Sequence, residues 1–212
     1  MISISGIGHQ KELQMLPYFN KGAALVLIGK KGKNLDKKIA QLTKIGYLET
    51  LKKGLYVSSA YVEGAPKEFY SEFIANVLRT PSYISSEYVL AKEGLIPESV
   101  FSVTSITTKT SRSFTNFLGT FIYRNIKPEL FTGYKENYWQ DKIVCTATKA
   151  KAMFDFFYFK KIDNIEQEIN DSRINWDNFS KDDLGEFERY AAISSERKMN
   201  DISVYIKNNY VD

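Results

Sequence analysis

The apolar positions with the clearest helical spacing lie between residues 34 and 46. Four apolar side chains recur there at intervals of four, three and three residues, which places them on one face of a helix. Asn34 precedes them at the expected N-cap, and Gly46 follows at the C′ position, where glycine commonly ends a helix. We therefore predict a helix whose buried face consists of Leu35, Ile39, Leu42 and Ile45.

Two extended runs follow this helix, at residues 47–51 and 55–58. They are joined by Lys52, Lys53 and Gly54, and a glycine in so short a connection is typical of a β-hairpin turn. The pattern thus predicts a hairpin with two lysines at its tip.

Shorter apolar stretches precede the helix. Residues 9–18 have weak helical spacing, and residues 23–28 are apolar up to Gly29. The lysine-rich run 30–33 cannot be core and predicts a turn. Short helices followed directly by a hairpin have the order of a winged helix-turn-helix, so we predict such a domain over residues 1–62.

The remaining chain, residues 63–212, predicts an α+β domain with a mainly antiparallel sheet and C-terminal helices. A polar segment at 63–67 is the expected boundary, and Ser85 is expected to cap a short helix that ends at Gly94. Runs rich in β-branched and aromatic residues predict the strands. The expected strands are 101–108, 114–117, 120–126 and 142–145, and the expected helices are 67–79, 85–90, 147–160, 181–192 and 195–208.

Composition limits the class of protein. The chain has 212 residues with 43% apolar content, enough for a sizeable core, and no window approaches 18 uninterrupted apolar residues. Residues 1–10 lack the charged start and apolar run of a secretory signal. Cys145 is the only cysteine, so no intramolecular disulfide can form. These features favour a cytoplasmic protein that spans no membrane.

Positive charge is concentrated at one end of the chain. Residues 1–62 hold ten lysines and three acidic residues, a net charge of +7, whereas the other 150 residues hold 19 basic and 22 acidic side chains. Such asymmetry indicates that the first segment meets a polyanion and the second does not.

The predicted helix turns its polar face outward, where it can enter the major groove of DNA. Lysines there can neutralise phosphates, and Gln41 can hydrogen-bond a base edge. Lysine lacks the planar fork with which arginine reads guanine, so we expect phosphate anchoring to dominate. A lysine-rich face can also be no more than solvated surface. The residues expected to contact double-stranded DNA are Asn34, Lys37, Lys38, Gln41, Lys44, Lys52 and Lys53.

The sequence gives little support to an enzyme. The only histidine is His9, and Cys145 falls in an apolar strand, so a nucleophile with a histidine base is not expected. Histidine and cysteine are too few for their usual metal sites, and no phosphate-binding glycine loop is present. Glu186 and Glu188 fall in a predicted helix and are expected to face solvent. We expect no catalytic residues, metal or cofactor.

The aromatic helix 147–160 is expected to cover the sheet. Its clustered rings are more typical of a core than of a base-stacking surface. Within it, Lys149, Lys151 and Asp155 are close enough in sequence to form an ion pair on the helix surface. Ser85 could bind an anion at a helix start, but capping is the commoner role of such a serine.

Three segments together resemble a known family. Residues 42–57 resemble the helix-to-wing passage of the AbiEi family of antitoxins. Residues 81–97 are similar to its central motif, a Tyr-Ile-Ser run entering a helix that ends in Gly-Leu-Ile-Pro, and residues 147–158 resemble its third motif. The chain departs from the family at Ala150, where a glutamate is usual before the lysine, and in the wing, where arginine is common.

The resemblance implies a type IV toxin–antitoxin or abortive-infection system. The chain would repress its own operon by binding promoter repeats, and its second domain would neutralise a nucleotidyltransferase-like toxin without a stable complex. Two alternatives remain open: a winged-helix transcription factor whose second domain senses a ligand, and a nuclease-like enzyme that uses the winged helix for docking. The oligomeric state is also open. The residues expected to serve antitoxicity are Tyr83, Ser85, Lys149, Lys151 and Asp155.

Overall fold

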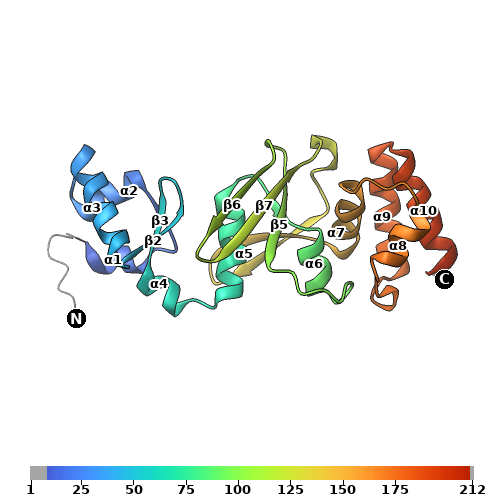
Figure 1. The fold of residues 1–212 in the computed structure, drawn as a ribbon, viewed down its shortest axis with the longest axis horizontal. Coiled ribbons are helices and arrows are strands. Elements are labelled where there is room, and N and C mark those ends of the chain that lie inside the picture. Colours follow the sequence, from blue (N-terminus) through green and yellow to red (C-terminus); the bar gives the residue numbers. More distant parts are fainter. Residues whose placement is uncertain (1–8, 211–212) are drawn as a thin grey trace. The chain divides into compact units, whose positions relative to one another are not determined.

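The protein is an α+β chain, represented here by a computed structural model that describes residues 9–210 (Figure 1). The segment 1–8, which includes most of the stretch inspected for a secretory signal, lies outside the described residues. The chain forms two compact units. The first comprises the residues up to Ser71 together with Phe114–Leu118, and the second comprises Glu72–Ser113 and Gly119–Asp212.

The first unit combines helices with a three-stranded antiparallel sheet whose strand order is β1-β3-β2. The predicted hairpin is confirmed: β2 and β3 are joined by a turn in which Gly54 has a φ of 80°, a conformation that glycine adopts without strain. In chain order the elements are α1 (Gln10–Met15), β1 (Phe19–Asn20), α2 (Lys21–Ile28), α3 (Gly32–Lys44), β2 (Leu48–Lys52), β3 (Leu55–Ser58) and α4 (Ser59–Gly64).

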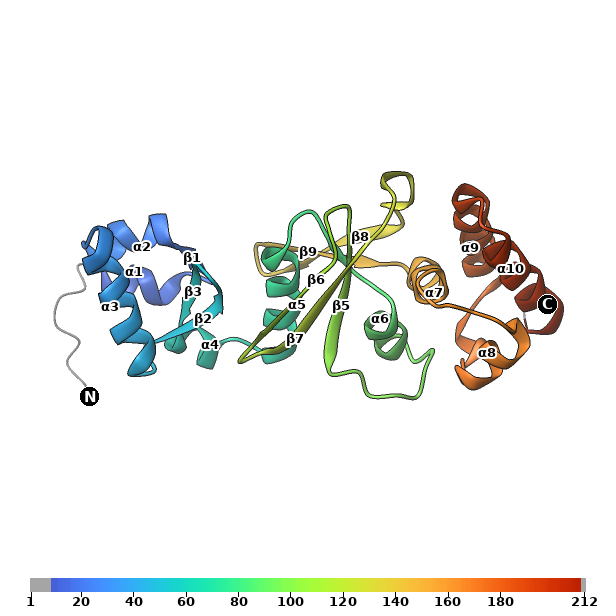
Figure 2. The ribbon, with the colours of Figure 1, turned by 45° about the horizontal axis from the view of Figure 1, so that its top comes forward.

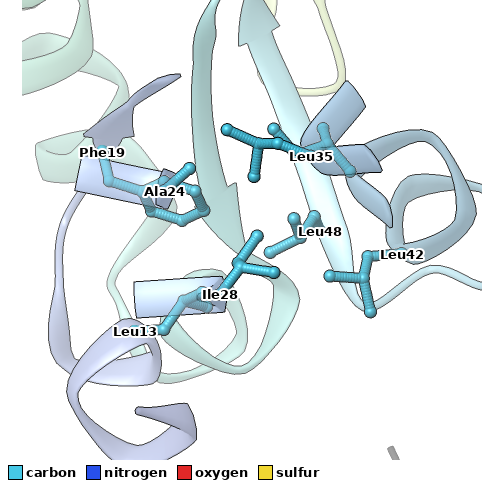
Figure 3. Packing of buried hydrophobic residues seen from close by; sticks show 8 residues of the cluster. Leu13, Phe19, Ala24, Ile28, Leu35, Leu42 and Leu48 are labelled. Atoms are coloured by element: carbon cyan, nitrogen blue, oxygen red, sulfur yellow. The ribbon is translucent and has the colours of Figure 1, made fainter. Parts of the chain in front are cut away.

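A small apolar core holds this unit together (Figure 3). Each of α1, α2 and α3 buries one or more side chains in it, and Phe19 and Leu48 enter from the strands. Residues beyond 62 complete the unit, since the fully buried Tyr70 donates its hydroxyl to the carbonyl of Pro17 at 2.7 Å. The buried members of the cluster are Leu13, Phe19, Ala24, Ile28, Leu35, Ile39, Leu42 and Leu48.

The ends of α3 differ in part from the sequence prediction. The helix begins at Gly32, with Lys31 as N-cap, so Asn34 lies inside the first turn and the prediction of Asn34 as N-cap is wrong. Ile45 is the C-cap and is 44% exposed, so its predicted place in the buried face is also wrong. The reason is that α3 is already ending there, and the chain turns at Gly46 with a φ of 71°. The predicted helix-ending role of Gly46 is confirmed.

A six-stranded sheet has the order β6-β7-β5-β4-β9-β8, and all of its strands except the last part of β6 belong to the second unit. We expected a mainly antiparallel sheet, but it is mixed: β5 pairs with β7 and β4 with β9 in parallel, while β4–β5 and β8–β9 are antiparallel. Apolar composition indicates strands but does not fix their direction of pairing. The strands are β4 (Tyr83–Ile84), β5 (Ser102–Thr107), β6 (Arg112–Asn116), β7 (Gly119–Asn125), β8 (Tyr134–Trp139) and β9 (Lys142–Ala147).

Helices cover both faces of this sheet (Figure 2). On one face, Tyr123 of β7 donates its hydroxyl to the carbonyl of Ala75 in α5. On the other face, Tyr83 of β4 contacts Asp155 of α7. The helices are α5 (Lys67–Leu78), α6 (Glu87–Lys92), α7 (Lys149–Tyr158), α8 (Ile165–Asp171), α9 (Lys181–Ser194) and α10 (Arg197–Asn209), with short 3₁₀ helices at Pro128–Leu130 and Trp176–Asn178.

The predicted helices and strands of this region are present with shifts of a few residues, but the two-residue strand β4 and the longer elements β8 and α8 were not expected. Five of the six β8 residues are exposed, because the strand forms the sheet edge and pairs with β9 alone among the described strands. Only Ile169 is buried in α8. Neither element therefore carries the apolar spacing by which strands and helices are recognised. Within residues 9–210, no helix has the length and apolarity needed to cross a membrane.

Candidate functional site

The outward face of α3 carries most of the residues expected to contact DNA. Leu35, Ile39 and Leu42 are buried, so the side chains on the opposite side of the helix point to solvent. Lys33 belongs to the same stripe but was not predicted, although its spacing of four residues from Lys37 indicates it. The stripe consists of Lys33, Lys37, Gln41 and Lys44, all of them exposed.

The flanks of α3 are different in character. Asp36, the only acidic residue in this helix, forms a 2.6 Å salt bridge with Lys21 of α2, so its charge is compensated. Lys38 lies on the other flank and is half-buried. Asn34 is exposed in the first turn. The exposed stripe therefore retains a surplus of positive charge.

A groove runs between α3 and the strands of the hairpin. Its volume is about 520 Å³, and it is lined by Asp36, Ile39, Ala40, Thr43, Lys44, Thr50 and Tyr56. Thr50, Tyr56 and Lys44 carry hydrogen-bond donors, whereas the hydroxyl of Thr43 is buried and Asp36 contributes a carboxylate that is paired with Lys21. Donors of this kind can bind phosphate and sugar oxygens.

The two lysines at the hairpin tip are not equivalent. Lys53 lies in the turn and is exposed. Lys52 ends β2 and is half-buried, and its ammonium lies 5.7 Å from the ring centroid of Phe114. Nearby, the Asn116 amide donates to the carbonyl of Leu51 at 3.0 Å. Lys53 is therefore better placed than Lys52 to meet a phosphate.

The second unit brings together four of the five residues expected to serve antitoxicity. Lys151 and Asp155 of α7 form an ion pair at 2.5 Å, and both side chains are 0% exposed. The predicted surface ion pair is therefore buried instead. Ser85 and Tyr83 donate to the second oxygen of Asp155, at 2.7 Å and 3.1 Å. The pair is buried because α7 packs on the sheet with one side and on α9 with another, leaving apolar neighbours all around.

Aromatic rings enclose the Lys151 ammonium. The ring centroids of Phe154, Tyr190 and Tyr83 lie 4.6, 5.3 and 5.7 Å away. The chain passes over this site at Gly133, where a Cβ would collide with the Tyr190 hydroxyl and with the aliphatic stem of Lys151. The cluster therefore has no room for a larger residue at position 133.

Burial shifts the ionisation of the cluster. It raises the pKa of the Asp155 carboxyl and lowers the pKa of the Lys151 ammonium, although each opposite charge partly reverses the effect on the other. Burial, with the Asp155 charge second, also raises the pKa of the Tyr83 phenol, so Tyr83 keeps its proton and acts as a donor. The arrangement is a closed polar network that connects β4 to α7.

Lys149 and Ser86 stand apart from this network. Lys149 contacts the carbonyl of Asn178 at 3.3 Å and Glu93 at 4.0 Å, so it is not brought to Asp155. The N-cap of α6 is Ser86 and not Ser85, whose hydroxyl is engaged with Asp155, so the predicted cap is wrong. Ser86 has a φ of 58°, and its buried hydroxyl has no hydrogen-bond partner among the described residues.

The remaining candidates for chemistry are scattered. His9 is exposed, and its ring nitrogen lies 3.3 Å from the carboxylate of Glu12. Cys145 is half-buried on β9, and burial raises the pKa of its thiol. Glu186 accepts hydrogen bonds from Thr148 and Tyr190. Over the described part of the chain, no three His, Cys, Asp or Glu residues gather in a way that could hold a metal ion.

Two groups of polar residues thus stand out: an exposed lysine stripe on α3 and a buried ion pair within α7. The stripe can attract an anionic surface, whereas the ion pair faces only the protein interior. No protein-family model, curated protein or solved structure matches this chain.

Proposed function

We propose that the chain is a cytoplasmic antitoxin of the AbiEi type that represses its own operon through a winged helix in its first unit. In this assignment α2 and α3 form the helix-turn-helix, α3 enters the major groove, and the β2–β3 hairpin is the wing. The order of α1, β1, α2, α3, β2 and β3 supports the assignment, since a recognition helix is followed there by a two-stranded wing.

The observation that carries the proposal is the exposed lysine stripe on α3. Its residues share the side opposite the buried Leu35, Ile39 and Leu42, so the face that packs and the face that binds are separate. The groove beside Lys44 and the exposed Lys53 extend the donor-bearing surface toward the hairpin. Because lysines act on phosphates as point charges, binding should depend strongly on salt.

The antitoxin part of the proposal rests on the second unit. The segments that resemble the family's central and third motifs, 81–97 and 147–158, are connected through the hydrogen bonds of Tyr83 and Ser85 to Asp155. These side chains are buried, so on our proposal they hold the antitoxin domain in shape and do not themselves touch a toxin. Neutralisation without a stable complex is compatible with this role.

Promoter binding tests the repressor assignment. We expect the full chain to shift DNA from upstream of its own gene, and Lys37→Ala with Lys38→Ala to weaken this binding at unchanged folding. Lys161→Ala with Lys181→Ala removes two exposed lysines of the second unit and serves as the matched control. If the α3 double variant bound DNA as tightly as the control double variant, α3 would not be part of the DNA-binding surface.

Growth of cells tests the antitoxin assignment separately. The chain is co-expressed with the neighbouring gene, which we expect to encode a nucleotidyltransferase-like toxin. Wild type and the Lys37→Ala, Lys38→Ala variant should both restore growth, because the second unit is intact in each. Failure of the wild type to restore growth would refute the antitoxin assignment while leaving DNA binding untouched.

A further inference from the structure

The lysine stripe of α3 is accompanied by two side-chain amides. Asn34 and Gln41 are both exposed, and each presents a hydrogen-bond donor and an acceptor side by side. The lysines that surround them can only donate. These two amides are therefore the side chains of α3 best suited to recognise a base edge that carries both a donor and an acceptor.

The spacing of the two amides allows them to reach two different base pairs. They are seven residues apart, so they lie on the same side of α3, displaced by about 20° around the axis. With a rise of about 1.5 Å per residue, they are separated by about 10 Å along the helix. Base pairs stack at about 3.4 Å along the duplex axis, and a helix that follows the major groove is inclined to this axis, so the distance spans at most about three base-pair steps.

Lysines flank this pair of amides on both sides. At about 100° per residue, Lys37 and Lys44 lie on one flank of the amide row, and Lys38 lies on the other. A helix set in the major groove with the amides toward the base edges would direct these ammonium groups toward the phosphates of the two groove walls. Phosphate contacts of this kind fix the position of the protein on the duplex, whereas base contacts determine which DNA sequence it prefers.

We propose that Asn34 and Gln41 each recognise one adenine through its N6 amino group and N7, at two different A·T pairs that lie within about three steps of each other. Adenine presents a donor and an acceptor in the major groove, and asparagine and glutamine amides match them with two hydrogen bonds. This inference rests on the proposed function, because it requires α3 to enter the major groove.

Selection from a pool of randomised duplexes tests the inference with the full chain. Wild type should enrich sequences with A·T pairs at two fixed positions within about three steps of each other. Gln41→Ala should lose the preference at one of these positions and Asn34→Ala at the other. Gln167→Ala, an exposed amide on α8 of the second unit, is the matched control and should select the wild-type sequence.

Adenine analogues then test the contact atom by atom. Replacing one selected adenine with 7-deazaadenine removes the N7 acceptor and keeps the base pair. We expect affinity of the wild type to fall about two- to ten-fold, because one of the two hydrogen bonds of the bidentate contact is lost. The variant that lacks the facing amide should bind the modified and unmodified duplexes equally well.

The outcomes separate this inference from the proposed function. Circular dichroism and thermal unfolding are expected to show that both variants fold, because the two amides are exposed. If the chain binds duplexes through its lysines but both alanine variants select the wild-type sequence, the inference is refuted and the proposed function stands. If the wild type binds no duplex, both are refuted.

Discussion

Helices α3 and α7 use lysine in opposite ways. In α3 the lysines of the stripe are exposed, whereas in α7 Lys151 is 0% exposed and paired with Asp155. The difference follows from the apolar residues around each lysine. α3 has one apolar face and leaves the other to solvent, while every residue from Ala150 to Phe157 in α7 is buried. A helix that is enclosed on all sides can hold a charge only beside an opposite charge.

The exposed lysines of α3 are available to a binding partner, whereas the buried Lys151 interacts only with groups of the protein itself. An exposed ammonium stays hydrated, and a polyanion can attract it without prior disruption of the fold. The Lys151–Asp155 pair lost its hydration on folding, so its ionic bond and the hydrogen bonds from Tyr83 and Ser85 mainly offset that cost. We therefore expect substitutions in α3 to change binding and substitutions in the buried cluster to change stability.

The largest expected effect follows from removing one partner of the buried pair. Asp155→Ala leaves the Lys151 ammonium buried without its counter-charge, which should lower the free energy of unfolding by about 3–5 kcal/mol. Urea denaturation monitored by circular dichroism measures this change. Asp36→Ala, which breaks the exposed pair with Lys21, is the control and should cost about 0–1 kcal/mol.

A double replacement sharpens the same comparison. Lys151→Met with Asp155→Leu removes both charges and keeps apolar volume, so it should recover much of the stability that Asp155→Ala loses. If Asp155→Ala and Asp36→Ala destabilised the chain equally, the distinction between the buried and exposed lysines would fail.

A smaller and opposite effect is expected at Ser86. Its φ of 58° and ψ of −142° are costly for any residue except glycine. Ser86→Gly should therefore raise the free energy of unfolding by about 1 kcal/mol, after the greater chain entropy of glycine is subtracted. Ser82→Gly is the control, because Ser82 also has a buried unpartnered hydroxyl among the described residues but no positive φ. A loss of stability in Ser86→Gly would contradict the strain argument.

The smallest effect concerns the reactivity of Cys145. Burial, and then the charge of Glu136, raises the pKa of this thiol above its usual value of 9.0. Less thiolate is therefore present at pH 8 than in a free cysteine, so alkylation by iodoacetamide should be slower and should accelerate as the pH rises above 9. Glu136→Gln should increase the rate at pH 8. A rate that matches free cysteine would show that the thiol is not shielded.

In the first unit the sequence predicted the helices α1, α2 and α3 and the hairpin, but it missed β1, α4 and the start of α3. The spacing of Leu35, Ile39 and Leu42 identified α3 because packing on one side produces a clear periodic pattern. The first turn of α3 was missed because Gly32 and Lys33 are poor signals for a helix start, and Ile45 was misplaced because an apolar residue at a helix end need not be buried.

The buried cluster could be predicted only in part. Lys151 and Asp155 were identified as an ion pair from their spacing, but their burial depends on α9 and the sheet, which contact α7 from distant parts of the chain. The apolar residues on every side of α7 were the available signal. The parallel pairing of β5 with β7 left no comparable signal, because strand direction depends on the connection and not on the residues of the strand.

Binding of the full chain to promoter DNA across a range of salt concentrations tests the central claim most directly. We predict that log affinity falls linearly with log salt, and that Lys37→Ala with Lys44→Ala reduces the slope by about two while the chain remains folded. A slope that is the same in wild type and variant, or no binding to the duplex at low salt, would contradict the claim that the lysine face of α3 is a DNA-binding surface.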